Sequence, residues 1–382
     1  MKIVLVIDQF DDANNGTTIS ARRFAMALKE HGNEVRVIAI GKNTDYKYAV
    51  RQMKFPPVVE HLITSQGMRL AIPNRHVFEK AAAWADVVHF MMPSPLAIMG
   101  LKHVEKLGIP HTAAFHCQPE NITFTLHMGN SRKANDLLYH GFRDTFFNRF
   151  THIHCPSNMI ANQLRQHGYT AQLHVISNGI SPEYFYDKRP KEDWMQGYFN
   201  ILMVGRYAGE KRQDELIEAC AKSRHAREIQ VILAGKGPLE KKYRKLAEKL
   251  PNPIVMQFYE PSRLIEILHM ADLYVHTSDA EIEAMSCMEA FACGLVPVIA
   301  NSPRSATPQF ALDERSLFPA GDTDALAERI DYWIEHPQER EEMERRYAEH
   351  AKQYALERSI EQTEDMFRMA IAEQKAAAKT KK

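Results

Sequence analysis

Two glutamates stand eight residues apart in an otherwise apolar stretch, SDAEIEAMSCMEAFACGLVPVIA. If a helix begins near Ala284, Glu281 lies in the loop before it and Glu289 lies on its inner face, about two turns further on. Because the flanking residues are apolar, we expect both carboxylates to face a cavity. A carboxylate accepts hydrogen bonds from two neighbouring hydroxyls, which suits a ribose or a hexose. For the pair taken alone, a solvated helix face is the alternative.

The start of this predicted helix offers a second kind of binding group. The backbone N–H groups of Ala284, Met285 and Ser286 precede the first intrahelical hydrogen bonds. A helix N-terminus also favours negative charge. We therefore expect a phosphate or a hydroxyl to bind at these three residues.

Two cations follow a predicted strand in the segment GRYAGEKRQDELIEA, where Arg206 comes directly after a glycine and Lys211 comes shortly after it. Arginine and lysine at the carboxyl end of a strand suit the two charges of a diphosphate. A solvated charged loop is the alternative. In the first half, Gly16 precedes a Thr-capped helix in DQFDDANNGTTIS and would let backbone approach a phosphate. A plain N-cap turn explains Gly16 equally well.

The elements that must position these residues are strands alternating with helices. Such alternation predicts parallel βαβ units with right-handed crossovers. Predicted strands in the first half are 3–7, 35–40, 87–91, 111–115, 153–156 and 174–177. The pattern restarts near residue 199, with strands at 199–204, 230–234, 254–258, 273–276 and 296–300. The sequence therefore predicts an α/β protein of two doubly wound modules, whose ligands bind outside the carboxyl ends of the strands.

Composition excludes several classes of protein. The 48 Lys and Arg balance the 48 Asp and Glu, which argues against nonspecific nucleic-acid binding. Five cysteines form no CxxC pair, so neither a disulfide framework nor a zinc knuckle is expected. The N-terminus MKIVLVIDQF is typical of a buried strand and not of a signal peptide, and no segment has the length of a transmembrane helix. The GxGxxG, Walker, GxSxG and HExxH motifs do not occur.

In combination, these motifs resemble glycosyltransferase family 4. The resemblance rests on Arg206 with Lys211, the turn at 235–238, the Glu-x7-Glu pattern followed by AFACGLVPVIA, and SNGISPEYF between the two halves. Members of this family are retaining enzymes that use nucleotide-sugar donors. They have the GT-B fold, in which two Rossmann-like domains face each other across a cleft.

The resemblance implies a role for each candidate residue. Glu289 would bind the ribose hydroxyls of a UDP-sugar donor, and Glu281 would bind the transferred sugar. Arg206 and Lys211 would hold the diphosphate and stabilise the charge of the leaving group. Gly16 would bring its loop against the same phosphates.

The resemblance also places residues around the sugar and the base. His116, at the end of HTAAFHC, matches the active-site histidine near the sugar, although outside this context it would be predicted as a core histidine. The base pocket would lie at 258–261 and include Tyr259. We expect an acceptor-binding domain at 1–180, a donor domain at 181–355, a helix at 356–374 that returns to the first domain, and a disordered tail at 375–382.

One departure from the family pattern concerns the turn after Glu281. The family usually has a glycine three residues after this glutamate, where this chain has Ala284, and an alanine does not take positive φ cheaply. Glu283 adds a charge near the sugar, so the donor hexose stays open between glucose and galactose.

The reaction implied by the resemblance needs neither a metal ion nor a cofactor. Cationic side chains and helix N-termini take the place of a divalent ion, and no DxD stands at a predicted strand end. No carboxylate is identified beneath the anomeric carbon. We therefore expect front-face attack, in which the donor phosphate takes the acceptor proton.

The acceptor is expected to bind the first half, because charge is distributed unequally along the chain. Residues 1–180 hold 19 Lys and Arg against 13 Asp and Glu, a balance of +6, which leaves −6 for the remainder. The segment 132–150 is basic and periodically apolar, and could lie in a membrane interface or face the core. Its candidate membrane or acceptor residues are Arg132, Lys133, Phe142, Arg143, Phe146 and Arg149.

From these features we expect transfer of a hexose to a membrane lipid, diacylglycerol or a ceramide, by a cytoplasmic protein held peripherally at the inner face of the cell membrane. One alternative is a transferase that builds surface polysaccharide on a sugar or a polyprenyl-linked acceptor. A second is a nucleotide-sugar epimerase or binding module of the same fold. The sequence leaves the oligomeric state open.

Overall fold

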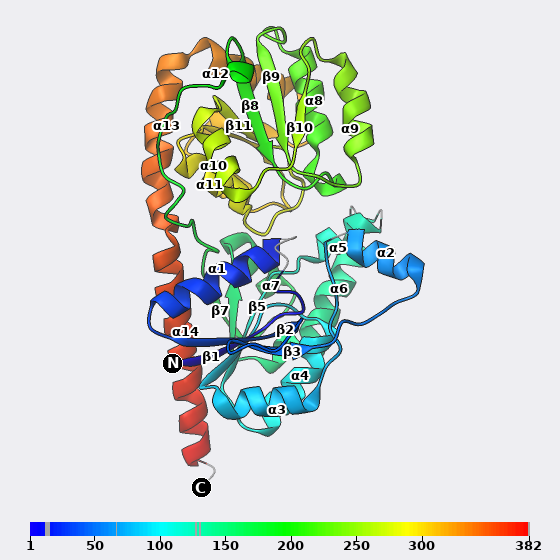
Figure 1. Ribbon diagram of the computed structural model, residues 1–382, viewed down its shortest axis with the longest axis vertical. Coiled ribbons are helices and arrows are strands. Elements are labelled where there is room, and N and C mark those ends of the chain that lie inside the picture. The colour runs from blue at the N-terminus through cyan, green and yellow to red at the C-terminus, as the bar shows by residue number, and fades with distance from the viewer. Residues whose placement is uncertain (12–15, 66, 127, 130, 381–382) are drawn as a thin grey trace. The chain divides into compact units, whose positions relative to one another are not determined.

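The computed structural model describes all residues except 12–15, 66, 127, 130 and 381–382. The chain divides into two units (Figure 1). The first comprises Met1–Pro119, Met128–Asn178 and Leu356–Lys382, and the second comprises Glu120–His127 and Gly179–Ala355.

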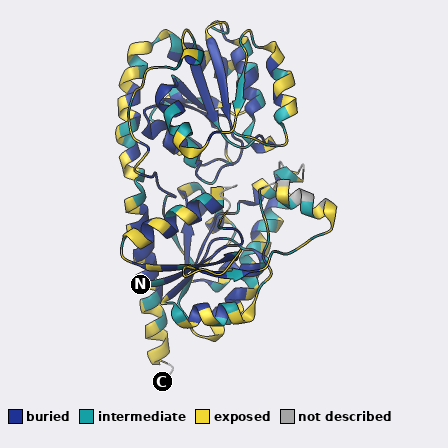
Figure 2. Cartoon of the chain, in the orientation of Figure 1, coloured by how far each residue is buried: buried dark blue, intermediate teal, exposed yellow. Residues whose placement is uncertain are grey.

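A parallel sheet of seven strands forms the centre of the first unit, in the order β3-β2-β1-β4-β5-β6-β7. Strands β1, β4, β5 and β6 are short and almost wholly buried, as expected where helices cover both faces of a parallel sheet (Figure 2). The strands are β1 (Lys2–Val6), β2 (Glu34–Ile40), β3 (Lys47–Val50), β4 (Val87–Phe90), β5 (His111–Ala114), β6 (His152–Cys155) and β7 (Gln172–Val175).

Four helices of the first unit, α3, α4, α6 and α7, start at side-chain caps. Asn74, Ser94, Ser131 and Ser157 each accept a hydrogen bond from a backbone N–H of the first helical turn. The helices are α1 (Gly16–Glu30), α2 (Pro57–Ser65), α3 (Arg75–Trp84), α4 (Pro95–Lys106), α6 (Arg132–Thr145), the 3-10 turn η1 (Phe147–Arg149), α7 (Asn158–Gln166) and α14 (Leu356–Thr380). Helix α5 (Pro119–Thr125) begins where the chain passes to the second unit.

The second unit is built on a parallel sheet of six strands, in the order β10-β9-β8-β11-β12-β13. Its core contains the fully buried side chains of Trp333, Tyr347 and Phe291. The strands are β8 (Phe199–Val204), β9 (Ile229–Ala234), β10 (Val255–Gln257), β11 (Leu273–His276), β12 (Pro297–Asn301) and β13 (Leu317–Pro319).

Helices connect these strands and pack on both faces of the sheet (Figure 1). The α-helices are α8 (Gln213–Lys222), α9 (Glu240–Leu246), α10 (Pro261–Met270), α11 (Met285–Ala292), α12 (Thr323–Glu335) and α13 (Pro337–Ala351). The short 3-10 turns are η2 (Asp193–Met195), η3 (Gly209–Lys211), η4 (Ala247–Lys249), η5 (Thr307–Phe310), η6 (Glu314–Ser316) and η7 (Lys352–Tyr354).

The last helix, α14, belongs to the first unit and packs against α1 and strands β4, β5 and β6. Phe367 is fully buried, with its ring centroid 5.2 Å from that of His89. Glu373 lies 3.0 Å from Nε2 of His152, which adds a polar contact to this packing. The tail predicted at 375–382 is helical to Thr380, so the expectation of disorder is wrong for 375–380, and 381–382 lie outside the described residues.

The predicted fold class, two doubly wound modules with parallel sheets, is confirmed. Two strands at sheet edges, β3 and β13, were not predicted. Lys47 begins β3 and Pro319 ends β13, so neither strand forms a continuous apolar run.

Candidate functional site

The two predicted cations lie in the loop after β8. Gly205 and Arg206 follow the strand directly, and Lys211 ends the 3-10 turn η3. Nη2 of Arg206 lies 2.9 Å from Oε1 of Glu210. The ammonium of Lys211 forms an ion pair with the carboxylate of Glu281, which comes from the loop after β11. The structure therefore brings one predicted cation and one predicted carboxylate into contact.

The turn after β9 needs its glycines because it packs backbone to backbone against this loop. A Cβ on Gly235 would overlap the carbonyl oxygen of Gly205, and a Cβ on Gly237 would lie 2.5 Å from that of Tyr207. The backbone N–H of Tyr207 donates to the carbonyl of Lys236 at 3.1 Å. Gly235 and Gly237 thus allow a close approach that holds the Arg206 loop in place.

Glu281 is the charged centre of this cluster. Its carboxylate is buried, and Oε1 contacts the Lys211 ammonium and lies 3.2 Å from Nε2 of His276. Burial by itself would raise the pKa of Glu281, but Lys211 and His276 outweigh burial and hold this pKa at about 2. Glu281 is therefore ionised at neutral pH and can act only as a hydrogen-bond acceptor.

The loops around Glu281 also hold one another through backbone groups. The hydroxyl of Thr277 lies 2.8 Å from the carbonyl oxygens of both Lys211 and Arg212. The carbonyl of Glu281 accepts a 2.9 Å hydrogen bond from the N–H of Ala306. Loops that follow β8, β11 and β12 are thereby joined at the carboxyl edge of the sheet, where ligands of doubly wound sheets bind.

Helix α11 begins as predicted after Glu281, and its N-cap residue is Ala284 at φ 63° and ψ 71°. The alanine takes the left-handed conformation that the family usually assigns to glycine, at a cost of roughly 1–2 kcal/mol. Its carbonyl accepts from the N–H of Cys287 at 3.0 Å, which closes the first turn. Ser286 lies in that turn, and Glu289 follows on a buried face of the helix with 8% of its surface exposed. Met285, between Ala284 and Ser286, is the first helical residue.

The residues predicted to form the base pocket lie just after β10. Tyr259 is 9% exposed, and burial raises the pKa of its hydroxyl. The preceding Phe258 is half exposed, and the ammonium of Lys236 lies 4.5 Å from the centre of its ring. Lys236 was not among the predicted residues. Through this contact it connects the turn at 235–238 with Phe258, and the contact becomes visible only in the folded chain.

In the first unit, the structure brings Gly16 and His116 into one neighbourhood. Gly16 starts α1, and the hydroxyl of the next residue, Thr17, lies 3.4 Å from the carbonyl of His116. Residues 12–15 of the predicted phosphate loop lie outside the described residues.

His116 belongs to a buried group of three imidazoles with His89 and His154. Burial, together with these two neighbours, holds the pKa of His116 well below its usual value. Its ring is therefore neutral at pH 7. Nε2 of His116 has no hydrogen-bond partner within the described part of the chain.

The segment 132–150, whose residues were candidates for membrane contact, is buried in part. Phe146 and Phe150 are buried in the core, where their rings contact Phe90, so the core-facing alternative is correct for this end of the segment. Arg143 forms ion pairs with Asp144. Arg149 pairs with Glu105, while Phe142 is partly buried.

The first half of α6 keeps an exposed basic and apolar face. Arg132 is 94% exposed at its side chain, and Lys133 is exposed beside it. Leu137, one turn after Lys133, is 72% exposed. The side chains that could touch a membrane are thus fewer than predicted and lie at the helix N-terminus.

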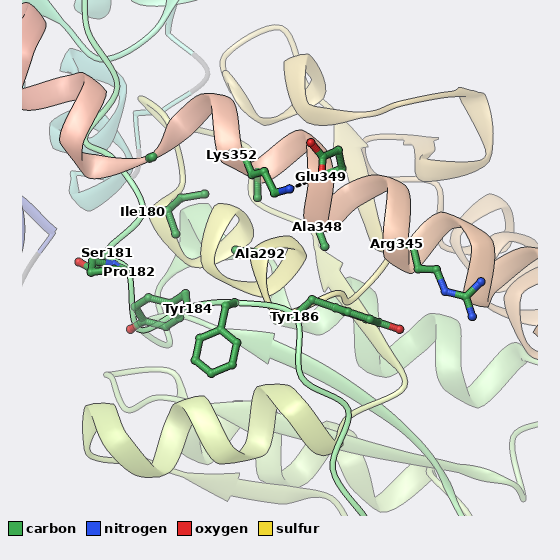
Figure 3. A pocket seen from close by; sticks show the side chains of 13 residues that line it. Ile180, Ser181, Pro182, Tyr184, Tyr186, Ala292, Arg345, Ala348, Glu349 and Lys352 are labelled. Atoms are coloured by element: carbon green, nitrogen blue, oxygen red, sulfur yellow. Dashed lines mark hydrogen bonds and ion pairs between the residues drawn. The ribbon is translucent and has the colours of Figure 1, made fainter.

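A pocket of about 390 Å³ lies elsewhere in the second unit, between the segment after residue 180 and helix α13 (Figure 3). Tyr184, Phe185 and Tyr186 line one side, and Lys352 pairs with Glu349 on the other. It contains none of the predicted donor residues.

Two further findings concern the described residues alone: no helix among them is long and apolar enough to cross a membrane, and they contain no cluster of three or more His, Cys, Asp or Glu arranged to hold a metal ion.

Two buried side chains next to the site, Tyr274 and His276, were missed by the sequence analysis. They stand on strand β11 in the segment LYVH, where a polar side chain on a central strand was the only available signal. His276 is 1% exposed and contacts Glu281.

Comparisons with known proteins show that the chain is similar to glycosyltransferases. A family model described as "Glycosyl transferases group 1" matches residues 186–353, and one described as "Glycosyltransferase Family 4" matches residues 14–184. EpsD of Bacillus subtilis (strain 168), a protein named as a glycosyltransferase, is 27% identical over 214 residues, which are 53% of this chain and 55% of EpsD. The match thus spans about half the length of this curated relative.

The chain is also similar to solved structures. Anabaena Alr3699/HepE in complex with UDP and glucose has a TM-score of 0.74 and 16% identity, covering 97% of this chain and all of that one. The catalytic domain of cholesterol-α-glucosyltransferase from Helicobacter pylori is 50% identical over 41% of this chain and 99% of its own, with a TM-score of 0.40.

The likeness to HepE, together with the two parallel-sheet units, defines a protein of the GT-B fold. With both halves matched by family models, the chain belongs to the family 4-like glycosyltransferases.

Proposed function

We propose that the protein is a retaining glycosyltransferase that moves a hexose, glucose or galactose, from a UDP-sugar to a membrane lipid such as diacylglycerol or a ceramide. The observation that carries the proposal is the contact of Lys211 and His276 with the ionised Glu281 at the carboxyl edge of the second sheet. This cluster supplies an acceptor for sugar hydroxyls beside cations that suit a diphosphate.

In the proposed donor site, each group meets one part of the UDP-sugar. Arg206 and Lys211 bind the diphosphate, and the first turn of α11 adds backbone N–H groups. Glu289 accepts from the ribose hydroxyls, while Glu281 accepts from a hydroxyl of the transferred sugar. UDP is the first nucleotide to test, because HepE, which shares the fold, has been solved with UDP.

In the proposed step, the bond between the anomeric carbon and the diphosphate oxygen breaks, and a bond from the acceptor oxygen forms on the same face. The acceptor proton passes to the departing phosphate, and UDP leaves. Arg206 and Lys211 stabilise the charge that develops on UDP. The neutral His116 supplies a hydrogen bond near the sugar. Such chemistry needs no metal ion, so we expect transfer to persist in EDTA.

The lipid acceptor rests on the surface of the first unit. Residues 1–180 carry a balance of +6, and the exposed start of α6 combines Arg132, Lys133 and Leu137. A basic face with an exposed leucine suits an anionic membrane interface. The burial of Phe146 and Phe150 reduces the apolar area available, which favours a second candidate, a transferase for a sugar or polyprenyl-linked acceptor.

The test is a donor and acceptor panel read by mass spectrometry. UDP-glucose and UDP-galactose are each incubated with diacylglycerol, ceramide, cholesterol or soluble oligosaccharides, with and without EDTA. Cholesterol is included because the Helicobacter pylori enzyme is named for it. We expect UDP release and an α-linked glycolipid. An isomerised sugar nucleotide instead would identify an epimerase, and glycosylated oligosaccharide alone would identify the second candidate.

Membrane contact is tested by flotation with anionic vesicles. The double variant K133E/L137D should bind less than the wild type, because it removes a cation and an apolar side chain from the exposed face of α6. The control M99D changes another exposed apolar residue, 52% exposed on α4, and should float like the wild type. Equal flotation of all three proteins would remove α6 from the proposal, and no flotation of the wild type would remove the membrane surface.

A further inference from the structure

Strand β11 places two polar aromatic side chains on one face, and one of them contacts the predicted donor residue Glu281. Tyr274 and His276 are two residues apart, so the alternation of a strand points them to the same side. Both are almost completely buried, at 0% and 1% exposure. Their rings are stacked, with centroids 6.1 Å apart and planes 24° apart. A histidine in this position has to satisfy two ring nitrogens without solvent.

These side chains form part of a chain of polar contacts. The tyrosine hydroxyl lies 3.3 Å from Nδ1 of His276 and 3.0 Å from the hydroxyl of Ser286. The Ser286 hydroxyl in turn donates to the carbonyl of Val204, at the end of β8. On its other side, Nε2 of His276 lies 3.2 Å from Oε1 of Glu281. The chain therefore connects the first turn of α11 with the carboxylate of Glu281.

The two oxygens of the Glu281 carboxylate are in different situations. Oε1 meets both the ammonium of Lys211 and Nε2 of His276. Oε2 takes part in no hydrogen bond or ion pair among the described residues, and it is not enclosed in the core. One oxygen is thus anchored, and the other remains available to a ligand.

Lysine alone could not define this orientation. An ammonium is a point charge on a flexible stem and attracts a carboxylate from many directions. A ring on a central strand has a fixed position, because its backbone is held in the sheet. A flexible ammonium and a rigid ring, both in contact with the same oxygen, together restrict the plane of the carboxylate and the direction of Oε2.

We propose that His276 and Tyr274 are positioning residues, which hold Glu281 so that Oε2 accepts a hydrogen bond from a hydroxyl of the transferred sugar. The inference rests on the proposed function for the identity of that ligand. A histidine that only fills the core would affect folding but not the contribution of the sugar to binding. The two roles therefore differ in a measurable quantity, the affinity for UDP-hexose divided by the affinity for UDP.

Two substitutions of His276 distinguish the contact made by Nε2 from the contact made by Nδ1. In His276→Gln the side-chain amide nitrogen takes the place of Nε2, so the contact with Glu281 is kept. In His276→Asn it takes the place of Nδ1, so the contact with Tyr274 is kept and that with Glu281 is lost. The variant Tyr274→Phe removes the hydroxyl that holds the ring. The control is His269→Asn, which loses the 3.0 Å contact of another buried histidine with the carbonyl of Phe185.

Calorimetry with UDP, UDP-glucose and UDP-galactose, and initial rates of transfer, give the readouts. For His276→Asn we expect UDP affinity within twofold of the wild type, with the sugar's contribution to affinity and kcat each reduced about tenfold. His276→Gln should stay within about threefold of the wild type on both measures, and Tyr274→Phe should fall between the two variants. His269→Asn should bind and react like the wild type.

The outcomes distinguish this inference from the proposed function. Positioning is overturned if His276→Asn keeps the full contribution of the sugar, if His276→Gln loses as much as His276→Asn, or if the wild type binds UDP-glucose and UDP-galactose no better than UDP. If the expected binding pattern appears but the wild type transfers no sugar, the positioning role stands and the proposed reaction falls. Unchanged UDP affinity shows that each variant is folded.

Discussion

The ion pair between Lys211 and Glu281 leads to a prediction about stability that does not depend on substrate. In Lys211→Met, a side chain of similar length keeps its packing but loses its charge. Glu281 is then a buried carboxylate whose main cationic partner is gone. Breaking a buried pair on one side is strongly destabilising, because an uncompensated charge remains.

The magnitude follows from the pKa of Glu281. The ordinary value of 4.5 is lowered to about 2 in the folded protein, even though burial acts in the opposite direction. This difference corresponds to about 3 kcal/mol of folding free energy. Since the pKa is lowered on folding, the contribution is fully present above pH 4.5 and is lost as the pH falls towards 2. We expect Lys211→Met to lose about 3 kcal/mol at pH 7.

The assay is unfolding by denaturant at a series of pH values, in which the free energy of unfolding of the second unit is measured. The difference between wild type and Lys211→Met should shrink between pH 5 and pH 2, because Glu281 becomes protonated in both proteins. Adding Glu281→Gln to Lys211→Met should restore stability, since it removes the unpaired charge. The matched control Lys222→Met breaks an exposed pair with Asp324 and should cost less than 1 kcal/mol. A double variant no more stable than Lys211→Met, or a difference that is independent of pH, would refute the reasoning.

Three further predictions follow from the same unit. Gly235→Ala should destabilise the protein by more than about 2 kcal/mol in thermal unfolding, because its Cβ would overlap the backbone of Gly205, whereas Gly209→Ala, with open space around it, should change stability by less than about 1 kcal/mol. Ala284→Val should cost about 2 kcal/mol, since a β-branched residue fits positive φ poorly, and Ala284→Gly should stay within about 1 kcal/mol of the wild type by the same measurement. Glu289→Ala should weaken UDP binding about tenfold in calorimetry; unchanged affinity would remove the ribose assignment.

Much of the fold could be predicted because local sequence and global topology agree. The apolar runs that became β1, β4, β8 and β11 are buried on both faces, so they read as continuous hydrophobic segments. The edge strands β3 and β13 have no such signal, since their position depends on the strand beside them. Helix α14 continues past its predicted end because the segment 375–380 contains alanine and lysine, which are good helix formers.

For the segment 132–150, the periodicity of apolar residues was not sufficient to predict their environment. The four-residue spacing of its phenylalanines correctly indicated an apolar face, but a membrane and a protein core select the same residues. Phe146 and Phe150 pack against Phe90 of β4, a strand more than fifty residues earlier in the chain. Only the position of that strand decided which apolar environment the rings enter.

The sequence by itself determined the order of strands and helices, the division into two parallel-sheet modules, and the set of charged groups at the carboxyl edge of the second sheet. Tertiary structure decided how these groups are paired. Lys211 and Glu281 are seventy residues apart and meet because β8 and β11 are neighbours in the sheet. His276 reads as an isolated polar residue in a strand, and becomes a partner of Glu281 only when the loop after β11 folds back over the strand end. Spacing along a chain can predict which residues share an element, but contacts between loops depend on the order of the strands that carry them.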